Sequence, residues 1–156
     1  MKIDDLDIQI LNELQDNGRI TNRELAQKLG ISASPTLERV KKLEQNGVIK
    51  KYATLVDPAS VGIGIFTFVQ VTLARHGKAS VENFMDNVKD VDAILECYHT
   101  TGHADFLLKV GVKDIQAYEH FILHTLTELP DVQYLETMVV MSTIKNNSKL
   151  PISRKD

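Results

Sequence analysis

The stretch LGISASPTLERVKKLEQNGVIKKY, residues 29–52, combines a glycine stop, a Ser-Ala-Ser-Pro entry and two Lys-Lys pairs. Gly30 suits the left-handed conformation that commonly ends a helix. Ser34 is suited to be the N-cap of the next helix and Pro35 its first residue, because a missing N–H costs nothing there. Asn46-Gly47 is expected to end that helix. The stretch therefore predicts a short, basic helix that begins at a tight turn.

Two more helices are predicted before this one. Apolar residues recur at one-face helical spacing from Leu6 to Leu14, after acidic residues that the positive end of a helix dipole favours. Thr21 and Glu24 have capping-box spacing for a second helix, which Gly30 ends. The inner face of the third helix is expected to contain Leu37, Val40 and Leu43. Three short helices in this order predict a helix-turn-helix.

The charge of the chain is unevenly distributed. Residues 1–60 hold nine Lys or Arg against nine Asp or Glu, whereas residues 61–156 hold nine against twelve. Residues 31–51 alone hold five bases and two acids. A local basic patch is what phosphate binding requires, because affinity follows the phosphates contacted rather than the net charge of −3. A solvated helix face would also show this pattern, so charge by itself leaves both interpretations open.

A helix-turn-helix places the N-terminus of its third helix in the major groove of DNA. Small and polar side chains at that end would approach base edges or flanking phosphates, and the basic side chains would neutralise the backbone. Free N–H groups at the start of the helix can also bind a phosphate. The residues expected to contact double-stranded DNA are Thr21, Ser32, Ala33, Ser34, Thr36, Glu38, Arg39, Lys41 and Lys42.

The second half of the chain alternates strands and helices. A strand is expected at 48–56, followed by a hinge around Gly62 and Gly64. The elements expected after the hinge are strands at 65–73, 93–100, 106–112 and 133–144, and helices at 79–88 and 115–129. This βαββαβ order is the ferredoxin-like arrangement, so the fold class is α+β. The expected domains are 1–47, a linker at 48–64, 65–145, and a polar, loose tail at 146–156.

The sheet is expected to be apolar on both faces. Phe66 and Phe68 point to one side of the first strand, whereas Val69 and Val71 point to the other. Two helices can cover only one face of a four-stranded sheet. The uncovered face therefore suggests a partner, most simply a second copy of the chain.

Four segments together carry a family resemblance: LDIQILNELQDNGR, ELAQKLGISASPTLERVKKLEQNGVIKKY, ECYHTTGHADFLLKV and ETMVVMSTIKN. In their order and spacing the chain resembles the Lrp/AsnC (leucine-responsive/asparagine-responsive, feast/famine) transcriptional regulators. The resemblance implies an N-terminal helix-turn-helix and a βαββαβ (RAM/ACT-like) effector domain. It also implies homodimers built across the sheets, assembling into octamers or other multimers of dimers. Glu38 departs from the base often found there in relatives, so the DNA sequence bound cannot be copied from them.

The resemblance further implies that a free amino acid binds at the contact between dimers, near the turn HTTGHAD, residues 99–105. Gly102 lets backbone N–H groups approach a carboxylate, the threonines offer hydroxyls, and Asp105 can face an α-ammonium group. A plain tight turn is the alternative interpretation. The expected effector-binding residues, the last two from a neighbouring subunit, are His99, Thr100, Thr101, Gly102, His103, Asp105, Thr137 and Val139.

Other functions find less support in the sequence. Cys97 is the only cysteine, and few acidic residues lie near the His120/His124 pair to complete a set of metal ligands. No metal or other cofactor is therefore expected. The sequence shows no pairing of a nucleophile with a base that would indicate an enzyme. No apolar run could span a membrane, and a cytoplasmic, nucleoid-associated protein is expected. The remaining alternatives are a DNA-organising assembly protein without an effector, and an amino-acid-sensing regulatory subunit of an enzyme.

Overall fold

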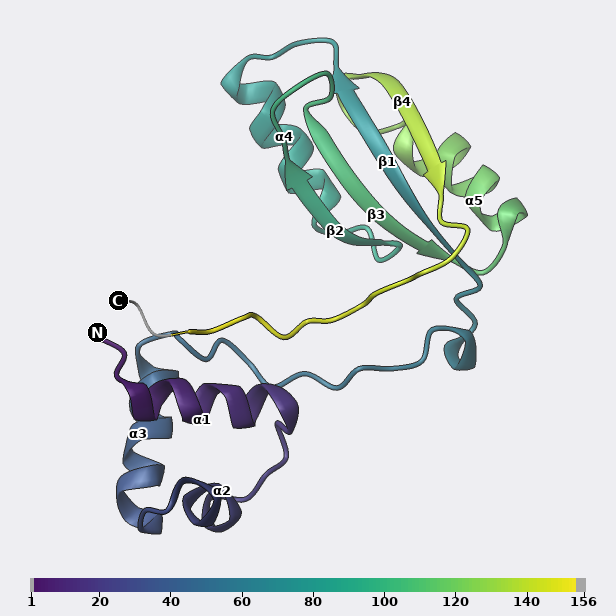
Figure 1. The fold of residues 1–156 in the computed structure, drawn as a ribbon. Helices are drawn as coiled ribbons and strands as arrows, with labels where there is room; N and C mark the ends of the chain where they lie inside the picture. Colours follow the sequence, from purple (N-terminus) through teal and green to yellow (C-terminus); the bar gives the residue numbers. More distant parts are fainter. Residues whose placement is uncertain (1, 154–156) are drawn as a thin grey trace. The chain divides into compact units, whose positions relative to one another are not determined.

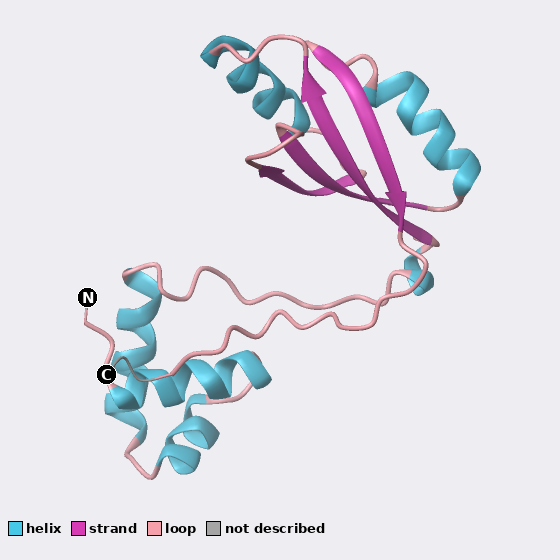
Figure 2. Ribbon diagram, turned by 45° about the horizontal axis from the view of Figure 1, so that its top comes forward, coloured by secondary structure: helices cyan, strands magenta, loops and turns pink. Residues whose placement is uncertain are grey.

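The computed structural model describes residues 2–153 of the chain (Figure 1). It divides into two compact units, one containing residues up to 55 together with those from 145 onward, and the other containing residues 56–144. Figure 2 shows that the first unit contains helices only and that the second contains the sheet. The division differs from the expected domains chiefly in the C-terminal segment, which belongs to the first unit. Within the tail that was expected to be loose, residues 149–152 are held: Leu150 hydrogen-bonds to Gln15 and Ile152 packs on the core, while 154–156 lie outside the described residues.

The first unit is a three-helix bundle, as the sequence predicts. Its helices are α1 (Asp5–Asp16), α2 (Asn22–Leu29) and α3 (Ala33–Gln45). Capping boxes begin the first two, with Asp4 and Thr21 as N-caps, and Gly30 ends α2 in the left-handed conformation. The buried core is small and contains one or two side chains from each helix: Ile10, Leu11, Leu25 and Leu43.

The start and the inner face of α3 differ from the sequence prediction. Ser32 rather than Ser34 is the N-cap, so Pro35 is the third helical residue instead of the first. Proline is still tolerated there, because the first N–H groups of a helix have no intrahelical acceptor. This start turns Thr36 into the core, whereas Leu37 is 42% exposed. The inward positions are 36, 40 and 43, which have the spacing of one helical face.

No strand forms at residues 48–56, where the sequence predicts one. Val48 and Ile49 lie in a bend and pack against the helical core, whereas residues 50–56 are exposed and Leu55 retains 82% of its accessible surface. Alternating apolar residues favour a strand only where a neighbouring strand supplies hydrogen bonds, and within the described chain this segment has no such neighbour. A one-turn 3-10 helix (Ala59–Val61) then leads to the second unit.

The second unit is a four-stranded antiparallel sheet with the strand order β2-β3-β1-β4. The βαββαβ prediction is confirmed. The elements are β1 (Ile65–Leu73), α4 (Lys78–Val88), β2 (Ile94–His99), β3 (Phe106–Val112), α5 (Ile115–Phe121), which continues as a π-helical turn (Ile122–Leu126), and β4 (Val132–Val139). The last helix and the last strand end earlier than predicted, and Met141 and Ile144 beyond β4 are fully exposed.

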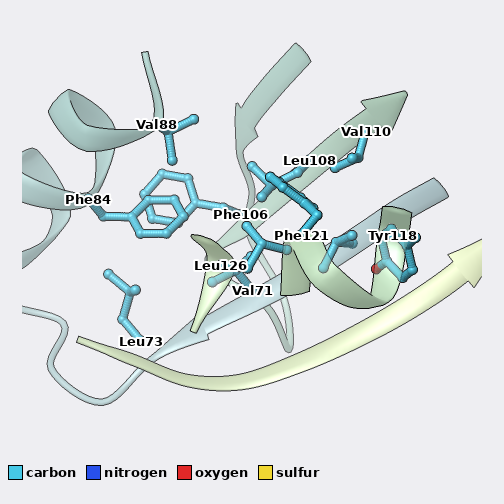
Figure 3. Packing of buried hydrophobic residues seen from close by; sticks show 11 residues of the cluster. Val71, Leu73, Phe84, Val88, Phe106, Leu108, Val110, Tyr118, Phe121 and Leu126 are labelled. Carbon is cyan, nitrogen blue, oxygen red and sulfur yellow. The ribbon is translucent and has the colours of Figure 1, made fainter. Parts of the chain in front are cut away.

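The core of this unit lies between one face of the sheet and both helices. Thr67, Val69, Val71 and Leu73 of β1 are buried on this face. Figure 3 shows the ring of Phe84 from α4 against the ring of Phe106 from β3, with their centroids 4.5 Å apart. Helix α5 contributes Tyr118, Phe121 and, from its π-turn, Leu126. Burial of this many large side chains is the main source of stability.

The opposite face of the sheet has no helix over it. We call it the open face. The strand register places on it the apolar and aromatic residues Phe66, Phe68, Tyr98, Leu107, Tyr134 and Met138. Tyr98, Tyr134 and Met138 are each more than 40% exposed. Lys109 and Glu96 form an ion pair on this face. The prediction that both faces of the sheet are apolar is confirmed.

The close contact between the backbone at Gly64 and the backbone at Lys113 gives a test of the fold. A Cβ added at Gly64 would lie 2.2 Å from the carbonyl oxygen of Lys113, whereas at Gly77 it would meet nothing. We expect Gly64→Ser to lower the free energy of unfolding by about 1–3 kcal/mol, because backbone must move. Gly77→Ser, the matched control at the N-cap of α4, should stay within about 0.5 kcal/mol of the unmodified chain. Urea unfolding followed by circular dichroism measures both, and equal midpoints would contradict this packing.

Candidate DNA-binding surface and effector groove

The exposed N-terminus of α3 is the candidate DNA-reading surface. Ser32, Ala33 and Ser34 are exposed there, and no side chain caps the first N–H groups of the helix. The amide of Asn22, at the start of α2, donates a 2.7 Å hydrogen bond to the carbonyl of Ala33. This bond holds the two helices of the motif together at the entrance of α3. The N–H groups at this helix start are free to donate hydrogen bonds to a phosphate, and that contact stays a prediction.

The basic residues of α3 differ in their availability. Lys41 and Lys42 are exposed, and within residues 2–153 neither has an ion-pair partner. Glu38 is exposed on the same helix. These three side chains are free to face DNA. Thr36 is not, because it is buried and its hydroxyl donates to the carbonyl of Ser32, so the prediction that it contacts DNA is wrong.

Arg39 is committed to a structural ion pair. Its Nη1 lies 2.7 Å from the Asp4 carboxylate and 2.8 Å from that of Asp7, whose side chain is only 4% exposed. The pKa of Asp4 is lowered first by the backbone N–H of Asp7 and then by Arg39. Both carboxylates raise the pKa of Arg39. The guanidinium thus joins α3 to the beginning of α1, and its contact with the DNA backbone stays a prediction.

Thr21, which the sequence places in the DNA-binding set, is an exposed N-cap. Its hydroxyl donates to the Glu24 carboxylate and accepts a hydrogen bond from the Glu24 backbone N–H. Both roles hold α2 in place. The position of Thr21 near DNA stays a prediction.

The ion pair of Arg39 makes a stability prediction. Arg39→Ala leaves the Asp7 carboxylate buried without its partner, and we expect unfolding free energy to fall by about 2–3 kcal/mol. Lys42→Ala, three positions along α3 and exposed, should change it by less than about 0.5 kcal/mol. Thermal unfolding of both variants measures this difference. A stable Arg39→Ala variant would show that the ion pair does not hold α3.

The second candidate site is a groove of about 360 Å³ at the turn between β2 and β3. Thr100, Thr101, Gly102 and His103, four residues of the expected effector set, line it together with Ala104. Gln70 of β1 and Leu107 of β3, which the sequence analysis missed, line it from the open face. These two residues are directly paired in the β1–β3 register, a relation that only the folded sheet creates. The volume lies at the lower end of the range for small-molecule pockets.

The turn itself is held in one conformation. The N–H of Thr100 donates to the carbonyl of Asp105, and its hydroxyl donates to the carbonyl of Ala104, 3.0 Å away. Gly102 has a φ of 120°, which other residues rarely adopt. Thr101 and His103 remain exposed at the rim. The groove therefore offers a hydroxyl, an amide, an imidazole and one apolar side chain.

Four of the predicted effector residues do not line this groove. The Asp105 carboxylate accepts from the Leu73 N–H at 2.8 Å and lies 3.1 Å from Nδ1 of His76. Asp105 is engaged within the chain, so its role toward an ammonium group stays a prediction. His99 stacks on Phe106, and Thr137 hydrogen-bonds to the Tyr118 hydroxyl at 2.6 Å. Strand register places His99, Thr137 and Val139 on the helix-covered side of the sheet.

The described residues also bear on metal sites and membrane-spanning helices. Residues 2–153 contain no group of three or more His, Cys, Asp or Glu that could hold a metal ion. The rings of His120 and His124 lie with their centroids 4.4 Å apart and tilted by 41°, and both residues are exposed. Among the described residues, no helix is long and apolar enough to cross a membrane.

The structure thus combines a helix-turn-helix, with free N–H groups and two free lysines on its third helix, and a ferredoxin-like sheet with a small groove. These features define the class of two-unit proteins that read DNA with one unit and carry a separate sensing or assembly unit.

Comparison with known proteins agrees with this class. Residues 3–50 match the winged helix-turn-helix DNA-binding family, and residues 67–150 match the Lrp/AsnC ligand binding domain. The leucine-responsive regulatory protein of Escherichia coli K12 is 39% identical over 153 residues, which cover 98% of this chain and 93% of that protein. The protein of the same name from Klebsiella pneumoniae is equally similar.

Solved structures show the same similarity. A transcriptional regulator from Neisseria meningitidis, solved as an L-Met complex, has a TM-score of 0.91 at 39% identity, covering 96% of this chain and 97% of that one. An AsnC family regulator from Agrobacterium tumefaciens has a TM-score of 0.90 at 32% identity, covering 95% and 96%. This chain belongs to the Lrp/AsnC family of DNA-binding transcriptional regulators.

Proposed function

We propose that this chain is a homo-oligomeric regulator whose DNA binding responds to a free amino acid held in the groove at residues 100–104. The groove is the observation that carries the proposal, because it combines N–H groups at a glycine, hydroxyls and an apolar side chain within amino-acid dimensions. The Neisseria relative, solved with L-Met, supports this chemical class of ligand. We further propose that the protein acts in the cytoplasm, on the nucleoid.

The groove by itself lacks a partner for the ammonium group of an amino acid. None of its lining residues is acidic, and Asp105 is engaged at the end of β1. A second subunit that brings an acceptor to the groove would complete the site. This requirement supports binding at a contact between copies, in dimers or multimers of dimers.

The open face is the natural surface for the dimer. Its exposed aromatic and apolar side chains lie on a flat sheet, and a two-fold arrangement would cover each copy with the other. A dimer of this kind would present two α3 helices to successive major grooves, about 34 Å apart or a multiple of that distance.

The engaged state of Asp105 also favours a second candidate function. A protein whose groove carries no acidic group could have lost its effector and act only as a DNA-organising assembly. The two functions differ in one observable property: DNA binding responds to an amino acid in the first and not in the second.

The DNA-binding role makes a charge prediction. We expect Lys42→Ala to weaken binding to all DNA sequences and to reduce the salt slope of log K by about 1, because one phosphate contact is lost. Lys78→Ala removes the same charge from α4, in the other unit, and should leave binding unchanged. Fluorescence anisotropy on specific and random duplexes at several salt concentrations measures both variants. Unchanged binding by Lys42→Ala would remove this face of α3 from the DNA contact.

The effector role makes a second prediction. Light scattering and DNA retardation are carried out on the unmodified protein with each of the twenty amino acids. We expect one amino acid to change the mass of the assembly or the mobility of the protein–DNA complex. Gly102→Trp fills the groove and should abolish that response, whereas Gly77→Trp, in open space on the same unit, should retain it. A full response in Gly102→Trp would exclude the groove as the site. DNA binding that no amino acid alters would favour the assembly function.

A further inference from the structure

The C-terminal segment makes a specific contact with α1. The side-chain amide of Gln15 donates to the carbonyl of Leu150 at 3.2 Å, and its oxygen accepts from the Leu150 N–H at 2.7 Å. One amide side chain therefore satisfies both backbone groups of one residue, as a neighbouring strand would. Such a reciprocal pair fixes the register of the segment along the helix.

Charge and burial support the same register. Lys149 Nζ lies 2.6 Å from the Asp16 carboxylate, in the last turn of α1, where that helix has no basic residue of its own. A cation there also complements the negative end of the helix dipole. Ile152 packs against the core cluster that α1, α2 and α3 share. Hydrogen bonds, an ion pair and apolar contact thus coincide within four residues of the segment.

The origin of this segment lies in the other unit. The chain leaves β4 at Val139, and the N–H of Val140 donates to the carbonyl of Phe66, an open-face residue of β1, at 3.0 Å. From Val140 to Lys149 the chain can span at most about 32 Å. The unit that reads DNA is consequently joined to the sheet twice, once through the linker before β1 and once through a docked C-terminal segment.

We propose that residues 149–152 are a strap whose docking surface is the Gln15–Asp16 end of α1. The strap completes the core of the helix-turn-helix unit and is the second chain connection between this unit and the sheet. A change at the open face would reach α1 through the strap, so that strap docking couples the sheet to DNA binding. This coupling rests on the proposed effector response, whereas the docking itself does not.

Hydrogen exchange on the full-length protein tests the docking. In Ile152→Asp we expect the amides in the last turn of α1 to exchange about tenfold faster, because a charge replaces the apolar contact with the core cluster. Lys149→Asp should give a smaller increase, and combining it with Asp16→Lys should restore slow exchange. Lys145→Asp makes the same charge change at an exposed position with no ion pair in the described chain, and should exchange like the unmodified protein. Unmodified exchange rates in both Ile152→Asp and Lys149→Asp would overturn the docking.

DNA retardation with and without a mixture of the twenty amino acids tests the coupling. Ile152→Asp is expected to bind DNA yet to lose most of the shift that the mixture causes in the unmodified protein. A full shift in this variant, despite faster exchange, would overturn the coupling. If the unmodified protein itself shows no shift, the proposed effector function fails, and hydrogen exchange still decides whether the strap docks.

Discussion

Strand β1 has apolar side chains on both of its faces, and the second unit depends on this constraint. Val69 and Val71 point to the helices and are fully buried, while Phe66 and Phe68 point to the open face. A strand of this kind must be central and must be covered twice. Within the described residues, the two helices cover one face only, and the open face is the observation behind the proposed dimer. The groove, which β1 lines through Gln70, lies on that same face.

The first unit depends on a different interaction. Its apolar core is small, and a buried carboxylate on α1 is neutralised by Arg39 of α3. A buried charge is tolerated only with a partner, so this pair orients the recognition helix as well as stabilising it. The basic residues of α3 therefore have two different roles, one in stability and one in the proposed binding of DNA. Arg39 holds the helix, whereas Lys41 and Lys42 remain available for phosphates.

The groove proposed for the effector offers only part of what an amino acid would need. Gly102 and the two threonines form a turn that could receive a carboxylate. The acidic residue of this turn, Asp105, instead binds the N–H of Leu73, at the end of β1, and the ring of His76. An amino acid carries two opposite charges, and each needs a counterpart when water is excluded. Assembly would therefore both cover the open face and complete the site, which links ligand binding to oligomeric state.

Local signals in the sequence determined most of the fold. These signals act over a few residues: the capping box at Thr21, the glycine at position 30 and the alternation along 65–73. They predicted the three N-terminal helices and the βαββαβ order of the second unit correctly. Tertiary structure decided what depends on distant partners. Thr36 lies in the core because α3 starts at Ala33. Arg39 is paired with an aspartate 32 residues away in the sequence. Residues 48–56 have no neighbouring strand to pair with. Gln70, Asp105 and Ile152 likewise acquired their roles only by packing, because periodicity shows which face a residue occupies but not what lies opposite it.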